Sequence, residues 1–414
     1  MVGRGHGRGV MERGLGWSPE LKERGFAFYS TDGNFRLHIN GGIQVDYAAF
    51  PRGQTGHDPG TEPDGFNLRR LRPILDFRLA RYIRGQIMPD LGLRRRSELF
   101  NAFIDFDAYE WARVRVGQFK PVMNVENQQG EFDLVFAERS FVQNFALRRD
   151  FGVQVTGRVF DRQVRYDLGV FNSNNGAIGN SSVPDVSADN NKLGMTRIMA
   201  TPFLLAGPQA FRKLDVGLGL LYGTCTQSAC SQPMLTMGQD RVIFQYGDRV
   251  TGNGFHTWLL PQMTWFWKRI GLISTFVHTW EPKVDRSTGK AGLLQHQAWM
   301  IQGELALTDD EPAFNRVLPK RPLTMRPGGG WGAWTFALRY SEQRLDHQTF
   351  TLNLGDATQY AETAKGYSVA LNWYPSREMR MQAIWEHTDF KGANSSFTAT
   401  PFSDVLVFRA TLLY

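Results

Sequence analysis

Residues 35–47 read FRLHINGGIQVDY, and apolar and polar side chains strictly alternate along this segment. The apolar series runs from Phe35 to Tyr47 and the polar series from Arg36 to Asp46, with only glycines interrupting them. Successive residues of a β-strand point to opposite faces, so the pattern predicts a strand with one apolar and one polar face. Such a run exceeds the common soluble strand of about 5–6 residues and suits a tilted strand that crosses a bilayer with roughly 9–11 residues.

The same alternation recurs along the chain, for example in FGVQVTGRVF at 151–160 and VRYDLGVF at 164–171. Short turns such as DRQ at 161–163 alternate with long polar segments rich in Gly, Asn, Asp and Pro. Short turns on one side and long loops on the other are typical of an up-and-down transmembrane barrel. The sixteen predicted strands are residues 35–50, 66–80, 82–88, 98–108, 112–120, 151–160, 163–171, 191–201, 213–223, 251–267, 270–282, 293–307, 331–346, 365–374, 377–390 and 402–414.

The predicted fold is therefore all-β: a 16-stranded antiparallel transmembrane β-barrel over residues 25–414, with an inward-folded third extracellular loop. One or two large soluble β-domains would explain the alternation, but not the strand number together with the asymmetry of the turns. The connector 308–330 is long for the short-turn side, and we expect it in the periplasm. The eight long segments are 51–65, 89–97, 121–150, 172–190, 224–250, 283–293, 347–364 and 391–401.

The first 24 residues lack the apolar core of a secretory signal. An outer-membrane barrel requires export, so we expect either that a signal peptide has been removed or that the true start lies upstream. Residues 1–24 are expected to be a flexible N-terminal segment, with at most a short helix start at Ser18-Pro19-Glu20. The net charge of +7 fits an anionic partner, and the absence of a nucleic-acid-binding motif argues against DNA or RNA.

Arginines are frequent on the polar register of the predicted strands. The guanidinium group stays charged and offers a planar fork of donors that fits an oxyanion. A row of such groups in a pore favours anions over cations. The alternative is an ordinary porin wall, in which Asp46, Asp76, Asp105, Asp167 and Glu386 on the same register neutralise part of the charge. The candidate pore residues on strands are Arg70, Arg72, Arg78, Arg113, Arg115, Arg158 and Arg165.

The third long segment, 121–150, contains many apolar residues for a solvated loop, including Phe132, Phe136, Phe141 and Phe145. We therefore expect it to fold inward, pack against the barrel wall and form the constriction. An ordinary packed surface loop is the alternative. The basic residues of this region complete the candidate anion-binding set: Lys120 at its root, then Arg139, Arg148 and Arg149.

The chain has two cysteines, Cys225 and Cys230, in the fifth long segment. In an exported protein this spacing favours a small loop disulfide, with a free pair as the alternative. Two thiolates are too few for a structural zinc site, so we expect no metal. No G-x-S-x-G, H-E-x-x-H or P-loop motif occurs. We accordingly expect neither enzymatic activity nor a cofactor, and a lipid hydrolase is a minor alternative.

Several segments resemble the phosphate-selective porin O and P family. They are VRVGQFKPVMNVEN (114–127), VFAERSF (135–141), LRRDFGVQVTGRVF (147–160), LGVFNSN (168–174), GGGWGAWTFALRYS (328–341) and VALNWYPSREMRM (369–381). The resemblance runs from about residue 25 to the end and implies a sixteen-stranded outer-membrane barrel, usually a homotrimer, with an arginine-lined anion pore.

Three short stretches can be matched to this family: Lys120, the pair Glu138-Arg139, and Arg148-Arg149-Asp150. Phosphate selectivity in the family requires a lysine cluster, and this chain has no lysine between Lys120 and Lys192. This departure argues against phosphate selectivity more than against anion preference.

The sequence thus predicts a passive porin of the bacterial outer membrane for small anions, such as phosphate or polyphosphate. The expected partners are these anions, outer-membrane lipid and lipopolysaccharide, and two further copies in a homotrimer. The alternative function is a structural or interaction barrel that a partner plugs or covers.

Overall fold

The structure is a computed structural model. It describes residues 17–20, 25–50, 64–92, 98–147, 149–172, 190–226, 233–238, 241–325 and 328–414.

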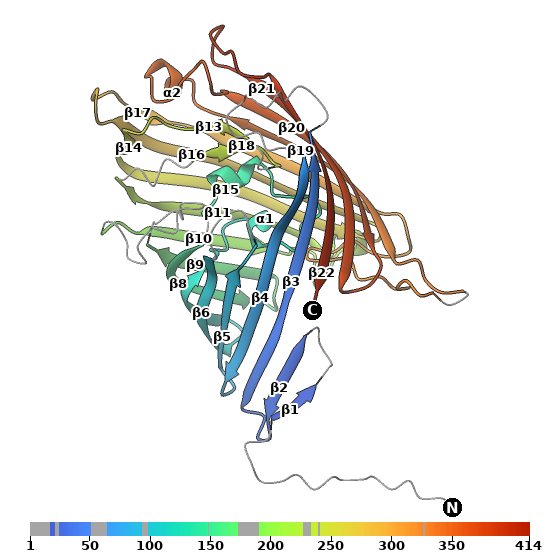
Figure 1. Cartoon of the computed structure of the whole chain (residues 1–414). Coiled ribbons are helices and arrows are strands. Elements are labelled where there is room, and N and C mark those ends of the chain that lie inside the picture. Colours follow the sequence, from blue (N-terminus) through green and yellow to red (C-terminus); the bar gives the residue numbers. More distant parts are fainter. Residues whose placement is uncertain are drawn as a thin grey trace, which may run out of the picture.

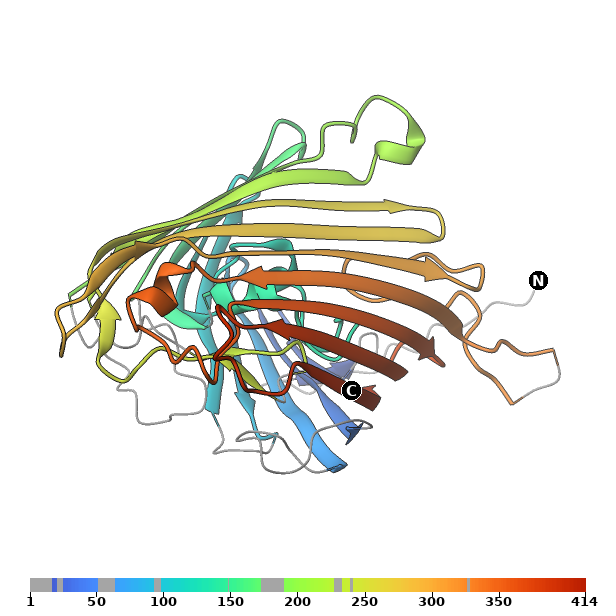
Figure 2. The same cartoon turned by 90° about the horizontal axis from the view of Figure 1, so that it is seen from above.

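Sixteen antiparallel strands in the described part of the chain form a closed ring (Figures 1 and 2). Each pairs with the next, and β22 closes the ring by pairing with β3, from Leu406↔Ala49 to Leu413↔Gly42. Every predicted strand overlaps an observed one, so the predicted fold class is confirmed. The strands are β3 (Phe35–Ala49), β4 (Gly65–Leu79), β5 (Ile83–Asp90), β6 (Glu98–Tyr109), β7 (Ala112–Phe119), β8 (Asp150–Val159), β9 (Val164–Phe171), β10 (Leu193–Ala200), β11 (Leu214–Cys225), β15 (Gly254–Trp267), β16 (Ile270–Asp285), β18 (Gln297–Ala306), β19 (Ala333–Arg344), β20 (Thr363–Tyr374), β21 (Met379–Lys391) and β22 (Phe402–Leu413).

Further short elements extend or fill this ring. The strands β14 (Val250–Gly252) and β17 (Ala291–Leu294) pair with β16 at its long-loop end. The strand β12 (Met234–Leu235) pairs with β13 (Val242–Phe244). The described helices are α1 (Val125–Gln128), η1 (Phe141–Phe145), η2 (Gln209–Phe211) and α2 (Gln348–Thr351). None of the helices in the described ranges is long and apolar enough to span a membrane.

The N-terminal region differs from the expectation. Residues Trp17–Glu20 form strand β1 and not the start of a helix, so that expectation was wrong. The strand pairs with β2 (Phe26–Ser30), which pairs with β3 beyond the end of β22. Pairing satisfies the backbone groups of this short segment, whereas a single helical turn would leave most of them open. The rest of the predicted flexible segment, 1–16 and 21–24, lies outside the described residues.

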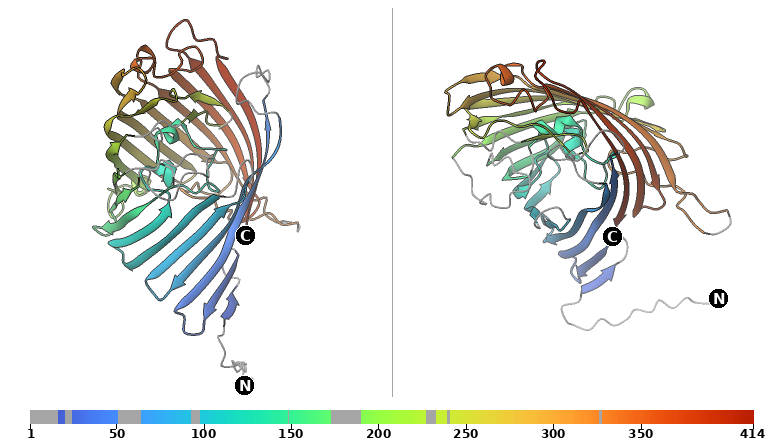
Figure 3. Two further views of the ribbon diagram at one scale, coloured as in Figure 1. Left: turned by 60° about the vertical axis from the view of Figure 1, so that its left-hand side comes forward. Right: turned by 45° about the horizontal axis from the view of Figure 1, so that its top comes forward.

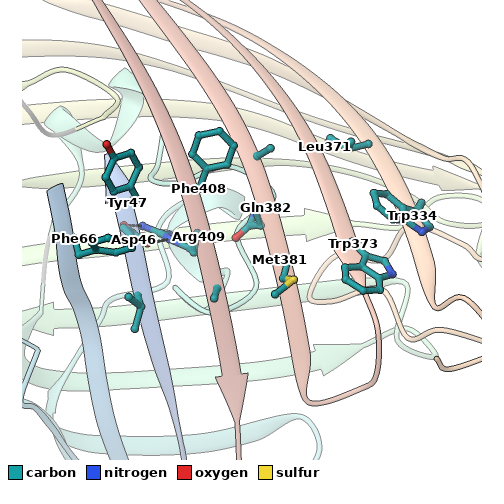
Figure 4. A pocket seen from close by; sticks show the side chains of 13 residues that line it. Asp46, Tyr47, Phe66, Trp334, Leu371, Trp373, Met381, Gln382, Phe408 and Arg409 are labelled. Atoms are coloured by element: carbon teal, nitrogen blue, oxygen red, sulfur yellow. Dashed lines mark hydrogen bonds and ion pairs between the residues drawn. The ribbon is translucent and has the colours of Figure 1, made fainter. Parts of the chain in front are cut away.

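The barrel is apolar outside and polar inside. In β22 the side chain of Phe408 is 53% exposed, whereas Arg409 is 3% exposed. Hydrocarbon requires this arrangement, because lipid solvates the outer face and backbone groups must pair within the ring. A hollow of about 450 Å³ lies in the outer face of β3, β4 and β19–β22. Figure 4 shows that aromatic side chains of these strands, Tyr47, Phe66, Trp373 and Phe408 among them, surround it.

Two long segments occupy part of the interior. The segment 121–147 carries α1 and η1 and lies inside the ring of strands (teal in Figure 3). Its apolar residues pack with those of 233–246 and with inward residues of β15, β16 and β18. At the short-turn end of the barrel, the described part of the connector 308–330 projects beyond the neighbouring short turns (Figure 2).

Candidate functional site

The wall of the barrel holds the segment 121–149 by hydrogen bonds to its backbone carbonyls. Arg380 in β21 donates to the carbonyl oxygens of Phe132 and Leu134 at 2.8 and 2.9 Å. Gln382, two residues further on the same face of β21, donates to Val135 at 2.9 Å. Alternate residues of one strand thus follow the backbone of the segment, which the predicted inward register of β21 makes possible.

The tip of the segment carries Glu138, which binds arginines of two strands. Its carboxylate accepts from Arg69 at 2.8 Å and Arg70 at 2.6 Å, both in β4, and from Arg409 in β22 at 3.2 Å. Arg409 also forms a bidentate pair with Asp46 of β3, with both N–O distances at 2.7 Å. This pair joins the first and last strands of the ring next to the segment.

A β-bulge explains how two consecutive arginines reach the same carboxylate. Gln44 pairs with Arg70, but the next residue, Val45, pairs with Leu68, so Arg69 is an extra residue in β4. A bulge places two residues opposite one and redirects a side chain. Strict alternation would have sent the side chain of Arg69 to the lipid face.

A second attachment involves Glu126 in α1. Its carboxylate accepts from the backbone N–H of Ser140 at 2.7 Å and from the hydroxyl of Ser140 at 2.6 Å. Arg339 in β19 lies 3.7 Å from Glu126 and pairs with Glu386 in β21 at 2.7 Å. Together these bonds fix the two short helices of the segment against the wall.

A third carboxylate, Glu131, is surrounded by four cations. Arg72 of β4 donates to it at 2.9 Å and Lys120 at 3.1 Å. Arg139 and Arg149 approach its oxygens at 3.4 Å. Sequence reasoning selected all four cations but not Glu131 as their common partner.

The charges of this cluster shift one another's pKa values. Burial alone would raise the pKa of the Glu131 carboxyl, but Lys120, Arg149, Arg72 and Arg139 hold it well below its usual value. Burial lowers the pKa of the Lys120 ammonium well below the ordinary lysine value, and the positive charge of Arg139 lowers it further. Burial also lowers the pKa of Arg149 to about 10. All three shifts follow from cations that crowd one carboxylate away from bulk water.

The remaining predicted arginines lie on β4, β7, β8 and β9. Arg115 forms a bidentate pair with Asp105 at 2.6 and 2.8 Å, and Arg165 pairs with Asp167 at 3.2 Å. Arg78, Arg113 and Arg158 form no side-chain hydrogen bond or ion pair with any described residue.

These three arginines share a position in the barrel. Arg78 is the penultimate residue of β4, Arg113 the second of β7 and Arg158 the penultimate of β8, so each lies next to a short turn. Short turns face the periplasm in such barrels. We call Arg78, Arg113 and Arg158 the mouth arginines.

The structure therefore divides the predicted set. Arg70, Arg72, Lys120, Arg139 and Arg149 contact the carboxylates and carbonyls of the segment 121–149, whereas the mouth arginines do not. Sequence reasoning left Arg69 out of the candidate set because strict alternation assigns it to the outer face. The only available signal was that RR at 69–70 interrupts the alternation.

Two predicted residues lie outside the described part of the chain, Arg148 and Cys230. Cys225, the last residue of β11, is disulfide-bonded. The predicted partner Cys230 stays a prediction, which peptide mapping under non-reducing conditions would check.

Part of the chain matches a known protein family. Residues 282–411 match the family model of phosphate-selective porin O and P. The resemblance inferred from the sequence is thereby confirmed over β18–β22 and their connections. The match covers less than a third of the chain, and together with the closed barrel it supports a channel of the bacterial outer membrane. No curated protein matches the chain.

Solved outer-membrane proteins share the fold of this chain at low identity. The outer membrane channel DcaP of Acinetobacter baumannii is 10% identical, with a TM-score of 0.57 and with 95% of this chain and 100% of that chain covered. The trimer form of OmpT from Vibrio cholerae is 8% identical, with a TM-score of 0.53 and coverage of 92% and 100%. An anion-selective porin from Comamonas acidovorans is 10% identical, with a TM-score of 0.51 and coverage of 92% and 100%.

Proposed function

We propose that this porin lets small anions diffuse passively across the outer membrane, with the segment 121–149 as its constriction. The observation that carries the proposal is the division among the arginines. Those near the segment are matched by carboxylates, whereas the mouth arginines have no described partner on a wall facing the lumen. In this proposal the mouth arginines attract anions to the periplasmic opening and repel cations.

The path of the solute follows from the packing of the interior. Apolar residues of the segments 121–147 and 233–246 pack against β15, β16 and β18 and against β19–β22. Carboxylates of the segment 121–147 bind arginines of β4 and β22. In this proposal solutes pass between the segment and the barrel wall and leave along the mouth arginines. Phosphate is one candidate anion, because an arginine fork binds its oxygens in pairs. Single-channel recording in chloride and in phosphate would compare the two.

The test of anion preference replaces the three mouth arginines by alanine. In planar bilayers with a salt gradient, we expect the reversal potential of Arg78→Ala/Arg113→Ala/Arg158→Ala to move toward cation preference. A matched control, Arg162→Ala/Arg212→Ala/Arg269→Ala, removes the same charge from exposed residues of short-side connectors. An unchanged potential in the first variant, or an equal shift in the second, would reject the mouth arginines as the selective element.

We also propose a homotrimer, supported by the trimer form of the structurally similar OmpT. Its apolar outer face would contact membrane lipid, lipopolysaccharide and the neighbouring copies. Native mass spectrometry in detergent would give the number of copies and the bound lipids.

The second candidate is a structural barrel without transport. The packing of the segments 121–147 and 233–246 inside the ring favours it, because a sufficiently filled lumen conducts nothing. Open-channel conductance separates the two functions, since a plugged barrel gives none.

A further inference from the structure

The surroundings of Glu131 combine an excess of positive charge with a geometry that holds one carboxylate. Its Oε2 accepts from Arg72 at 2.9 Å, and its Oε1 from Lys120 at 3.1 Å. Arg139 and Arg149 each lie 3.4 Å from Oε1. These cations come from three places: strand β4, the end of β7, and two points of the segment 121–149.

The cluster remains positive after its own carboxylates are counted. Besides Glu131, the structure shows Asp90 bound to Arg72 at 2.7 Å. Four cations thus face two carboxylates among the described residues. The side chains of Lys120 and Arg149 are each 15% exposed to solvent, so the cluster borders solvent.

An aromatic ring fixes two of the cations. The guanidinium carbons of Arg72 and Arg149 lie 4.4 and 4.3 Å from the ring centre of Phe100, within the range of cation–π contacts. Arg149 also donates to the side chain of Asn101 at 2.9 Å. Both guanidinium groups are therefore held in place by contacts that do not depend on Glu131.

We propose that Glu131 is a tethered counter-anion, and that its carboxylate occupies a binding site for small carboxylate anions. The site consists of Arg72, Lys120, Arg139 and Arg149. The side chain of Glu131 competes with free anions for these cations and thereby weakens their binding to a level that permits release. Its role in permeation rests on the proposed anion channel, whereas binding of a carboxylate to the emptied site does not.

The class of ligand follows from the occupant. Two coplanar oxygens on one carbon receive all the donors, as acetate or a dicarboxylate would present them. A phosphate carries its oxygens around a tetrahedral centre and does not reproduce this planar pair on one carbon. Carboxylates should therefore bind better than phosphate when Glu131 is shortened.

The first experiment measures binding without conduction. Glu131→Ala removes the tethered carboxylate and leaves its place open, whereas Glu131→Gln keeps the place filled. We expect sodium acetate, compared with sodium chloride at equal ionic strength, to raise the thermal unfolding midpoint of purified Glu131→Ala in detergent. The midpoints of the native chain and of Glu131→Gln should not respond, and phosphate should act more weakly than acetate.

The control for this experiment is Glu304→Ala. Glu304 is also buried and lies on the inner face of β18, but it forms no ion pair with a described residue. Its removal takes away another buried carboxyl group without emptying a cation cluster, so acetate should have no specific effect. Equal responses of Glu304→Ala and Glu131→Ala to acetate, or no response of the latter, would overturn the proposed site.

The second experiment measures permeation and needs only the isosteric variant if Glu131→Ala does not fold. We expect Glu131→Gln to shift the reversal potential toward anions and to lengthen blocks of the current by added acetate. No shift relative to Glu304→Gln would overturn the competing role of Glu131. A native chain that conducts nothing would instead reject the proposed channel. The effect of acetate on the unfolding midpoint of Glu131→Ala would still decide whether the carboxylate site exists.

Discussion

Two regions of the barrel wall carry arginines on the same inward face but use them differently. Around the segment 121–149, Arg70, Arg339 and Arg409 are buried and bind carboxylates. At the short-turn end, Arg113 and Arg158 form no side-chain hydrogen bond or ion pair with a described residue. A buried guanidinium must be paired to offset its desolvation, whereas one next to water need not be. The number of arginines alone therefore does not measure how much charge a pore offers to a solute.

The largest expected difference between the two regions concerns stability. Arg409→Ala leaves the buried carboxylates of Asp46 and Glu138 without a shared partner, at the junction of the first and last strands. Removing one partner from a buried ion pair costs about 3–5 kcal/mol. We expect a loss of this size in the free energy of unfolding, measured by urea titration in detergent.

The matched variant in the other region is Arg158→Ala. It removes an exposed side chain without a described partner, so we expect a change within about 0.5 kcal/mol. Similar losses for Arg409→Ala and Arg158→Ala would contradict the division into structural and solvent-facing arginines.

The sequence predicted the strands and their faces well because lipid imposes a simple rule. A membrane strand must be apolar at every second residue, and the ring must close, so alternation and turn lengths determine the topology. The extra strands β1 and β2 were missed, since β2 (Phe26–Ser30) is short and lies outside the repeating pattern of long strands.

The candidate site was predicted only in part. The register gave the inward arginines, but their partners are set by how 121–149 folds in three dimensions. Glu131 and Glu138 lie 59 or more positions from the strand arginines that bind them: Arg72 and Glu131 are separated by 59 positions and Arg70 and Glu138 by 68. No local pattern encodes such distant pairs, and the bulge at Arg69 changes faces without a sequence rule.

The carboxylates of the segment 121–149 should make the stability of the chain depend on pH. Burial raises and the surrounding cations lower the pKa of Glu131 and Glu138, with a net fall below the ordinary 4.5. The folded chain thus binds fewer protons than the unfolded one, and the stability from these groups is complete above pH 4.5. It is lost only as pH falls below 4.5 through the lower folded pKa values.

We therefore expect the unfolding midpoint to stay level from neutral pH to about 4.5 as far as these groups contribute, and to fall in more acidic buffer. Glu131→Gln should show a shallower acid fall than the native chain. A native midpoint that already drops above pH 4.5, with Glu131→Gln equally affected, would argue against paired carboxylates as the source.

In each region, replacing arginine by lysine should have a smaller effect than replacing it by alanine. Lysine keeps the charge but loses the planar fork. At Arg409 the fork binds both oxygens of Asp46 at 2.7 Å, so Arg409→Lys should lose roughly 1.5–3 kcal/mol, the value of a hydrogen bond to a charged group. At Arg158, where charge and not the fork is proposed to act, Arg158→Lys should leave both stability and reversal potential unchanged. A clear change of reversal potential in Arg158→Lys would mean that the mouth arginines recognise the geometry of the anion. Both regions would then use the guanidinium fork, and they would differ only in whether it binds a protein carboxylate or a free anion.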